Sequence, residues 1–189
     1  LKIIMYKNKK ILAIIPARGG SKGIKLKNLK KINNKSLVQL ACEEIKKIKY
    51  IDYSMISTDN LKIAKEAQKF NINFPFLRPN YLSGDLISDF QIIEYNLRKI
   101  EKINKVKFDV ILLIQPTSPL RKSTHIIKGL KKLIDLNLDS VWSISKVNLK
   151  FHPLKQLKYN SKIDRLSLFD IKGKKIIARQ QLENTFYRN

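Results

Sequence analysis

An α/β protein built on a mainly parallel sheet is predicted by two features of the sequence. Short apolar runs typical of buried strands alternate with segments whose apolar residues recur at helical spacing. Three of these runs end in polar turns: Arg18-Gly19-Gly20, Thr58-Asp59 and Gln115-Pro116-Thr117-Ser118. Because open α/β sheets bind ligands beyond the carboxyl ends of parallel strands, these turns form the predicted functional site.

Five strands are expected, each a short apolar run bounded by polar or turn-forming residues. The run 11–16 is the first, and the strongly apolar run 110–114 is typical of a sheet centre. The others are expected at 53–57, 73–77 and 140–144.

Four helices are expected between these strands, at 36–49, 61–70, 88–101 and 123–136. Ser36 is a suitable N-cap for the first helix, and Asn71 can take the left-handed position that closes the second. The buried side of the third helix is expected to carry Phe90, Ile93, Leu97 and Ile100.

The last part of the chain differs from this alternating pattern. Residues 147–162 are polar and irregular around His152-Pro153, and a hairpin is expected at 169–177 with Lys172-Gly173 at its turn. We therefore expect a single domain, 1–189, from which residues 146–180 leave the main sheet as a lid or dimer contact.

Length and composition favour a globular protein. The 189 residues suffice for one sizeable core, and 43% of them are hydrophobic. No apolar run approaches the ~18 residues of a membrane span, and the first ten residues lack the apolar stretch of a signal peptide. The single cysteine, Cys42, excludes an internal disulfide and a cysteine-based zinc site. A cytoplasmic enzyme without a membrane partner fits these features.

The formal net charge of +24 raises the alternative of a basic nucleic-acid-binding protein. Residues 1–50 hold 14 basic and 2 acidic residues, whereas residues 51–100 hold 6 of each. Ile, Lys and Asn are all abundant, as an AT-rich coding sequence would produce. The aromatic residues form no stacking motif for single-stranded RNA, so we expect no specific nucleic-acid partner. The alternative predicts oligonucleotide binding that weakens steeply with salt.

The turn after the first strand, Ile14 to Asn28, concentrates glycines and cations. A triphosphate needs backbone N–H groups that approach closely and positive charge that offsets its own. The spacing matches neither a Walker A loop nor a dinucleotide-binding fingerprint. A plain surface turn is the alternative, but the density of Arg and Lys around the glycines favours phosphate binding.

Six sequence blocks follow one another on this strand–helix pattern. They are Ile15–Ile24 with Lys27-Asn28; Ser57-Thr58-Asp59 with Ile63-Ala64; Arg78-Pro79 with Leu82-Ser83 and Asp85; Leu113–Arg121; Ser140–Ser143 with His152-Pro153; and Arg179–Leu182 through Arg188-Asn189. In these blocks the chain resembles the acylneuraminate cytidylyltransferases, also called CMP-sialic acid synthetases. The resemblance covers the chain from Ile11 to Asn189.

The resemblance implies a Rossmann-like three-layer α/β/α nucleotidyltransferase fold and a homodimer. It also implies a reaction in which CTP activates a nine-carbon (nonulosonic) acid, giving the CMP-sugar and pyrophosphate for lipopolysaccharide or capsule synthesis. The sequence leaves open whether the acid is sialic, legionaminic or pseudaminic acid. A degenerate member that binds CTP without turnover is the second alternative.

The resemblance also assigns residues to roles. Contact with the reacting phosphates is expected from Arg18 and Lys27, the catalytic candidates. Nucleotide binding is expected from Gly19, Gly20, Ser21, Lys22, Asn28, Arg78 and Asp85. Sugar binding is expected from Gln115, Thr117, Ser118, Arg165 and Arg179.

Other roles stay open for several of these residues. Lys22 and Lys27 are alternatively solvated surface lysines, and Arg78 and Asp85 alternatively form a structural ion pair. Asp59 either supports the site or caps the helix that follows it.

Similar alternatives apply to the remaining candidates. Asn28 either fixes its loop or touches the nucleotide. The hydroxyls of Thr117 and Ser118 alternatively cap the helix that begins at Ser123, while Arg165 and Arg179 are alternatively basic residues of an exposed hairpin.

The chain departs from the family pattern in three places. Lys25 and Glu183 stand where the family usually has Pro. The family's late Asp-x-Asp segment, which holds the metal, is expected beyond Asn189, so we expect no metal ligand within this chain and a missing C-terminal end. Mg²⁺ is the cofactor that the resemblance implies.

Overall fold

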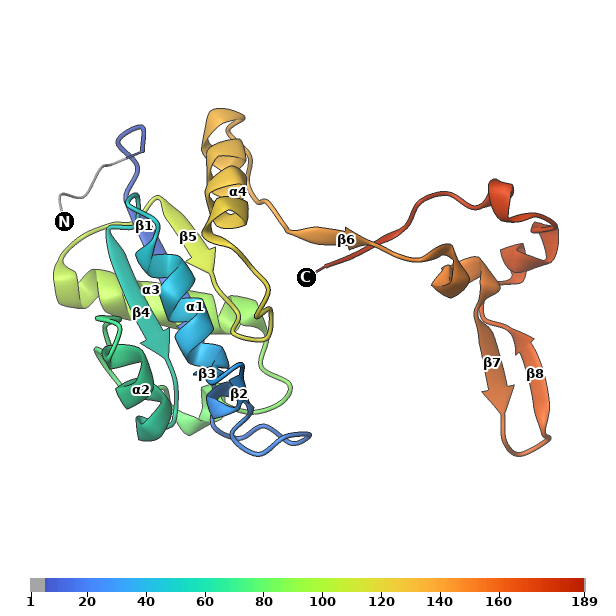
Figure 1. Cartoon of the computed structure of the whole chain (residues 1–189), viewed down its shortest axis with the longest axis horizontal. Helices are drawn as coiled ribbons and strands as arrows, with labels where there is room; N and C mark the ends of the chain where they lie inside the picture. Colours follow the sequence, from blue (N-terminus) through green and yellow to red (C-terminus); the bar gives the residue numbers. More distant parts are fainter. Residues whose placement is uncertain (1–5, 189) are drawn as a thin grey trace. The chain divides into compact units, whose positions relative to one another are not determined.

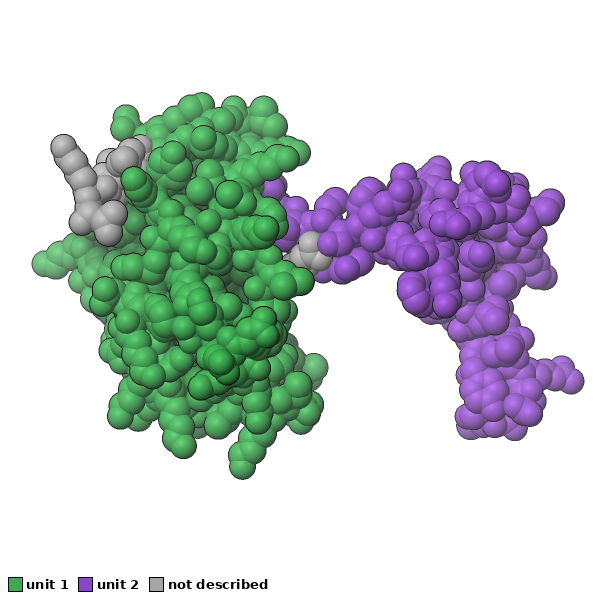
Figure 2. Space-filling model, viewed as in Figure 1, with its two compact units in different colours: residues 1–136 green, residues 137–189 purple. Residues whose placement is uncertain are grey.

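The computed structural model describes residues 6–188. Its chain forms two compact units, Leu1–Leu136 and Asn137–Asn189, which have different colours in Figure 2. Leu1, where the sequence begins, and Asn189, where the sixth block ends, lie outside the described residues. The expected single domain with a lid or dimer segment at 146–180 stays a prediction, and the two units are described separately.

The first unit contains a parallel sheet whose strand order is β4-β1-β5 (Figure 1). Strand β1 (Ile11–Pro16) pairs with both β4 (Tyr53–Ser57) and β5 (Val110–Leu113), so that Ile14 lies opposite Met55 on one side and Leu113 on the other. The predicted parallel sheet is confirmed. Its centre, however, is β1 rather than the run 110–114, because β1 has strand partners on both sides and helices over both faces.

Four helices cover this sheet, within a few residues of their predicted bounds: α1 (Leu37–Lys46), α2 (Leu61–Gln68), α3 (Asp89–Asn104) and α4 (Ser123–Asp135). Alternate residues of β1 face opposite sides of the sheet. Ile15 packs in one cluster with buried residues of α1, α2 and α4, whereas Ile14 packs with Ile100 of α3. The first unit is therefore the expected three-layer α/β/α sandwich.

Polar side chains close the ends of these helices as the sequence predicts. The Ser36 hydroxyl accepts the Gln39 N–H at the start of α1, and Asn71, just after α2, has the left-handed φ of 54°. Ser88 and Gln91 form a reciprocal capping box at the start of α3. This capping box fixes the point at which α3 enters the site described below.

The buried face of α3 is predicted only in part. Ile100 is buried and Leu97 packs against the same core cluster, as predicted, but Phe90 is 70% exposed and the other buried residues are Ile92 and Asn96. The Asn96 side-chain N–H donates to the Ser57 hydroxyl at 2.9 Å and to the Ile92 carbonyl at 2.6 Å. A buried amide with such partners occupies a core position that hydrophobic periodicity assigns to an apolar residue.

The strand expected at 73–77 is also largely wrong. Its only paired residue in the described part of the chain is Asn73, which forms an isolated parallel bridge with Met55. The segment leads instead into the short 3₁₀ turn η2 (Asn80–Leu82).

The second unit contains two antiparallel pairs, β6 (Ile144–Lys146) with β9 (Phe186–Arg188) and β7 (Leu157–Asn160) with β8 (Arg165–Leu168). The strand expected at 140–144 therefore starts at its last residue and belongs to a separate two-stranded ribbon. The remaining short elements of the chain are η1 (Lys27–Leu29), β2 (Lys31–Ile32), β3 (Lys35–Ser36), η3 (Leu149–Phe151), η4 (Pro153–Lys155), η5 (Ile171–Lys175) and η6 (Arg179–Gln181).

The hairpin of the second unit lies earlier than predicted. Residues 157–168 form it, and the Tyr159 hydroxyl donates to Asp164, which has a left-handed φ of 49° at the turn. The predicted hairpin at 169–177 contains η5 instead, because the Asp170 carboxylate accepts the Lys172 N–H and starts a 3₁₀ turn.

The described residues of the second unit bury little apolar surface of their own. Leu182 is 8% exposed, but Trp142, Phe151 and Leu166 are each at least 60% exposed. Within residues 6–188, no helix is long and apolar enough to cross a membrane.

Cys42 of α1 provides a test of the packing between α1 and the sheet. Burial raises the pKa of its thiol from 9.0 to about 12, so the folded protein keeps the thiol neutral. The stabilisation that comes from keeping the thiol neutral is complete below pH 9 and is lost as the pH rises toward 12. Over that range the free energy of unfolding falls by up to about 1.4 kcal/mol per pH unit. We expect the free energies of unfolding of the wild type and Cys42→Ala to converge between pH 9 and pH 12. A constant difference across that range would contradict the assignment.

Candidate functional site

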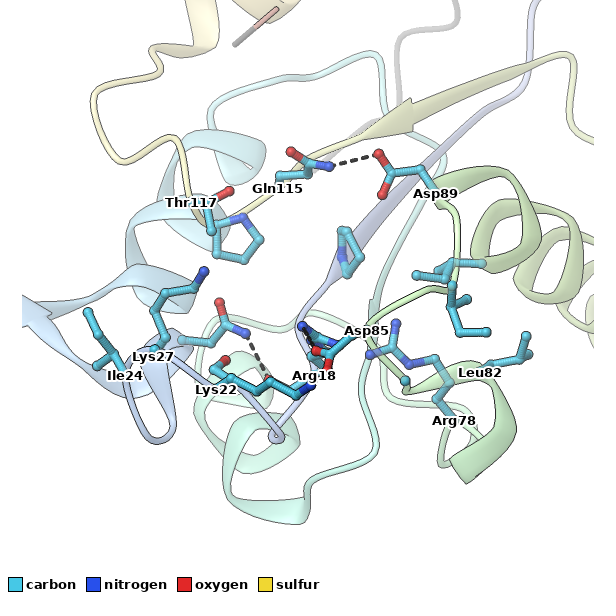
Figure 3. A pocket seen from close by; sticks show the side chains of 18 residues that line it. Arg18, Lys22, Ile24, Lys27, Arg78, Leu82, Asp85, Asp89, Gln115 and Thr117 are labelled. Carbon is cyan, nitrogen blue, oxygen red and sulfur yellow. Dashed lines mark hydrogen bonds and ion pairs between the residues drawn. The ribbon is translucent and has the colours of Figure 1, made fainter. Parts of the chain in front are cut away.

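A cavity of about 560 Å³ lies in the first unit at the carboxyl ends of β1 and β5. Figure 3 shows the side chains that line it. Nine of the predicted site residues are among them: Arg18, Ser21, Lys22, Lys27, Asn28, Arg78, Asp85, Gln115 and Thr117. The polar turns that follow two neighbouring parallel strands therefore meet at one cavity, as the sequence predicts for a ligand site.

The remaining predicted residues lie elsewhere. Gly19, Gly20 and Ser118 belong to the same turns but are not among the lining residues. Arg165 is the first residue of β8 and Arg179 the first of η6, and both are exposed in the second unit. Their expected contact with the sugar stays a prediction.

One carboxylate holds two of the cations that face the cavity. Arg18 Nη2 lies 2.6 Å from Asp85 Oδ1, and Lys22 Nζ lies 2.5 Å from Asp85 Oδ2. Lys22 and then Arg18 hold the pKa of the Asp85 carboxyl below its usual range. Asp85 therefore forms an ion pair, but with Arg18 and Lys22 rather than with Arg78 as the sequence alternative had it.

Arg78 is a buried cation at the same cavity, with only 2% of its surface exposed. Its backbone N–H donates to the Thr58 carbonyl at 2.8 Å, so the backbone of Arg78 lies beside the residue that follows β4. Its side-chain Nε has no hydrogen-bond partner among the described residues. Burial lowers the pKa of the guanidinium, the Asp59 carboxylate raises it and Arg18 lowers it. A buried, incompletely paired guanidinium is suited to an anionic or acceptor-rich ligand.

The sequence left open whether Asp59 caps α2 or supports the site, and the structure shows that Asn60 is the cap. Asn60 caps α2 by accepting the Lys62 N–H at 2.9 Å, whereas Asp59 Oδ1 accepts the Gly19 N–H at 2.7 Å. A Cβ on Gly19 would lie 2.9 Å from the Asn60 Cβ, so the close approach requires glycine. Asp59 thus supports the loop that carries Arg18.

The loop is held from its other end by Asn28. This residue is 5% exposed, and its side-chain N–H donates to the Arg18 carbonyl at 3.0 Å. The Ser21 N–H donates to the Gly19 carbonyl at 3.0 Å. Because the N–H groups of Gly19 and Ser21 are engaged in this way, their role as phosphate donors stays a prediction.

Replacing Asp59 with Ala should loosen this loop, because the Gly19 N–H loses its acceptor. We expect a loss of stability near about 1 kcal/mol in thermal unfolding and, for the nucleotide that the sequence leads us to expect at this site, an affinity about 10-fold lower in calorimetry. Asp109→Ala is the matched control, because Asp109 likewise accepts a backbone N–H, that of Lys10 at 2.8 Å. Equal losses of affinity in both variants would contradict a specific role of Asp59.

Two residues at the site were not assigned a role from the sequence. Asp89, the first residue of α3, lines the cavity, and its Oδ2 accepts the Gln115 side-chain N–H at 2.9 Å. Arg121 Nη1 donates to the Gln115 carbonyl at 3.1 Å, and burial lowers the pKa of Arg121. The partner of Asp89 lies 26 positions away, so no local pattern indicates that contact. Arg121 contacts a carbonyl of its own connection between β5 and α4, but this arginine was assigned no role from the sequence.

The start of α4 has its own acceptors. Glu44 of α1 accepts the Ser123 N–H, and His125 Nδ1 accepts the Lys122 N–H at 3.4 Å. The alternative that Thr117 and Ser118 serve this helix as caps is therefore not required by the structure.

The described residues do not fit a bound metal. Within residues 6–188, no group of three or more His, Cys, Asp or Glu side chains could hold a metal ion. At the cavity, both Asp85 oxygens face cations and one Asp89 oxygen faces Gln115. We therefore assign no chemical step to Mg²⁺ in this part of the chain.

Comparison with known proteins identifies the family. The family model described as Cytidylyltransferase matches residues 12–188, nearly the whole chain. The chain belongs to the cytidylyltransferase family. The resemblance seen in the six sequence blocks is thereby confirmed at the level of the family.

Curated relatives of this cytidylyltransferase carry several names. The chain is 36% identical over 119 residues to the post-translational flagellin modification protein B of Campylobacter coli (63% of this chain, 51% of that protein). It is 31% identical over 162 residues to an N-acylneuraminate cytidylyltransferase of Escherichia coli O18:K1:H7 (86% and 37%) and 33% identical over 150 residues to a CMP-N,N'-diacetyllegionaminic acid synthase of Legionella pneumophila (75% and 60%). The chain thus spans between 37% and 60% of the length of these relatives.

A solved structure shows the same fold. A CMP:2-keto-3-deoxy-manno-octonic acid synthetase complexed with CTP superimposes with a TM-score of 0.62 at 18% identity, covering 95% of this chain and 71% of that one. At this identity the similarity establishes the α/β nucleotidyltransferase fold of the cytidylyltransferase chain and nothing about its substrate.

Proposed function

We propose that the cavity binds CTP and that this cytidylyltransferase activates a nonulosonic acid, giving the CMP-sugar and pyrophosphate for surface glycan synthesis. One observation carries the proposal. Arg18, Lys22, Lys27 and Arg78 all line a cavity at the carboxyl ends of the parallel strands, and an internal carboxylate already bridges two of them. Such a concentration of cations is suited to a triphosphate.

In the proposed reaction a hydroxyl oxygen of the acid sugar bonds to the α-phosphorus of CTP. The bond between that phosphorus and the bridging oxygen breaks, pyrophosphate leaves, and the hydroxyl proton is released. Negative charge grows on the leaving group, so the contribution of Arg18 and Lys27 is electrostatic stabilisation and positioning. Lys22, Arg78 and the loop from Gly19 to Asn28 hold the nucleotide.

The acid sugar is proposed to contact Gln115, Thr117 and Ser118, with Arg165 and Arg179 pairing with its carboxylate. The names of the relatives support a nine-carbon acid, but they include both acylneuraminate and diacetyllegionaminate enzymes. The proposal is therefore the class of nonulosonic acids. Mg²⁺ as cofactor and a cytoplasmic location complete the proposal.

Pyrophosphate release tests this function directly. The product of the full reading frame that contains this chain is incubated with CTP, Mg²⁺ and sialic, legionaminic or pseudaminic acid in turn, with UTP replacing CTP as the control nucleotide. We expect release with CTP and one of the acids. A folded protein that binds CTP but releases no pyrophosphate with any acid would support the degenerate alternative, and salt-sensitive oligonucleotide binding without CTP binding would support the nucleic-acid alternative.

We also propose that the chain acts as a homodimer through its second unit. The support is the apolar surface that this unit leaves exposed, including Trp142, Phe151 and Leu166. Light scattering after size exclusion should give twice the mass of the chain, and Leu166→Lys should lower it to that of one chain. Lys158→Glu, a change of an exposed charge on the adjacent strand, is the control and should leave the dimer intact. A monomeric wild type would contradict the proposal.

A further inference from the structure

Gln115 and Asp89 form a pair that joins two elements at the edge of the cavity. Gln115 follows β5, and Asp89 is the first residue of α3, 26 positions earlier in the chain. The Gln115 Nε2 donates to Asp89 Oδ2 at 2.9 Å, and both residues line the cavity (Figure 3). The pair is thus part of the ligand site rather than of the core beneath it.

The chemistry of the pair determines which end of the amide faces the carboxylate. An ionised carboxylate only accepts hydrogen bonds, so the amide must present its NH₂ group to Asp89. The Gln115 Oε1 is consequently directed away from Asp89 (Figure 3). Without the carboxylate, the two ends of the amide could exchange by rotation about the last side-chain bond.

Neighbouring groups outside the pair hold the backbone of both residues in place. Arg121 fixes the Gln115 backbone carbonyl at 3.1 Å. Asp89 follows the Ser88 cap of α3, where the capping box fixes the backbone and the helix dipole favours a negative charge. The orientation of the amide is therefore a property of the ligand-free site.

The pair lies on one side of the cavity, and three cations lie on the other. Arg18, Lys22 and Arg78 lie on the side opposite Gln115 and Asp89 in Figure 3. A carboxylate repels phosphate groups, so the phosphates are favoured on the cationic side. The ligand part that meets Gln115 is then an uncharged part.

We propose that Asp89 is a positioning residue that orients the Gln115 amide with its oxygen as a hydrogen-bond acceptor, so that Gln115 selects a ligand N–H or O–H donor. This inference rests on the proposed function for the identity of the ligands. The donor comes either from the 4-amino group of cytosine or from a hydroxyl or N-acyl amide of the acid sugar, and the experiment below distinguishes the two.

A double-mutant cycle tests whether Asp89 acts through Gln115. Asp89→Ala, Gln115→Ala and the double variant are compared for the Kd of CTP, UTP and the acid sugar. We expect Asp89→Ala to weaken binding of one ligand about 10-fold, with kcat changed less than about 3-fold, and to have no further effect in the Gln115→Ala background. Additive losses in the double variant would overturn the proposal.

The same cycle identifies the donor, and a conservative variant separates orientation from charge. If cytosine supplies the donor, Asp89→Ala reduces the preference for CTP over UTP; if the sugar does, only the affinity for the sugar falls. Asp89→Asn keeps the size of the side chain but carries both an acceptor and a donor, so it can pair with either end of the Gln115 amide and should restore only part of the lost affinity. An Asn variant that binds as tightly as the wild type would contradict an orienting role of the carboxylate.

A ligand-free measurement keeps this inference separate from the proposed function. In the NMR spectrum of the ¹⁵N-labelled chain, the Gln115 side-chain N–H that faces Asp89 should be shifted downfield from that of a solvated glutamine, and should lose this shift in Asp89→Ala. Identical Gln115 signals in the two proteins would overturn the inference even if CTP binds. If neither CTP nor any of the acids binds, the proposed function is refuted. The NMR result would still show whether Asp89 orients the Gln115 amide.

Discussion

Replacing Arg78 with Met is expected to raise the stability of the protein while lowering its affinity for CTP about 100-fold. The gain in stability arises because the guanidinium is 2% exposed and its Nε lacks a partner among the described residues, which makes its burial costly. Met has similar length without the charge, so we expect a gain of about 1–2 kcal/mol. The loss of affinity arises because, among the described residues that line the cavity, Arg78 is the only cation that comes from the segment after α2. Thermal unfolding and calorimetric titration with CTP measure the two effects.

Arg98→Met is the matched control, because Arg98 lies on the exposed side of α3 with its side chain 78% exposed and paired with Glu94. We expect this variant to change the equilibrium constant for unfolding and the Kd for CTP by no more than about twofold each. If Arg78→Met destabilised the protein and left CTP affinity unchanged, Arg78 would be a structural residue rather than a ligand-binding one.

Replacing Arg18 with Ala is expected to lower kcat/KM for pyrophosphate release about 1000-fold. The guanidinium can contact two phosphate oxygens at once, and its contribution grows as charge develops on the leaving group. Stability should change by less than about 1 kcal/mol, because the Arg18 and Asp85 side chains are 32% and 34% exposed and such a pair is weak. Arg18→Lys retains the charge without the planar fork, so we expect it to recover only part of the activity.

Lys25→Ala controls for the net charge of the loop, since Lys25 is an exposed cation in the same turn. We expect its activity to remain within about threefold of the wild type. A loss in Lys25→Ala as large as that in Arg18→Ala would show that the loop acts through its overall charge, and would contradict a specific phosphate contact by Arg18.

The prediction of the first unit from sequence succeeded where the signal is local. The strands 11–16 and 53–57 and the bounds of the four helices follow from apolar periodicity and from caps such as Ser36, which act over a few residues. The buried face of α3 was predicted correctly at Ile100 but not at Asn96, which is a polar residue in the core. Its burial depends on the Ser57 hydroxyl, 39 positions away, and no local pattern records that partner.

The second unit was predicted poorly for a related reason. Its strands are exposed, so they show no alternation of buried and exposed residues, and its hairpin depends on the contact between Tyr159 and Asp164. The short Lys172-Gly173 sequence is typical of a tight turn, but the Asp170 side chain makes it part of a 3₁₀ turn.

The sequence by itself determined the family, the α/β class and the turns that form the site, because apolar periodicity and turn-forming residues are properties of neighbouring positions. It did not determine the partners across the site. The pairing of Asp85 with Arg18 and Lys22, of Asp59 with Gly19, and of Asp89 with Gln115 joins segments that are far apart in the sequence. These segments come together only through the packing of the three parallel strands and their helices. The pairing of the charged and polar side chains at the site is therefore decided by the tertiary structure.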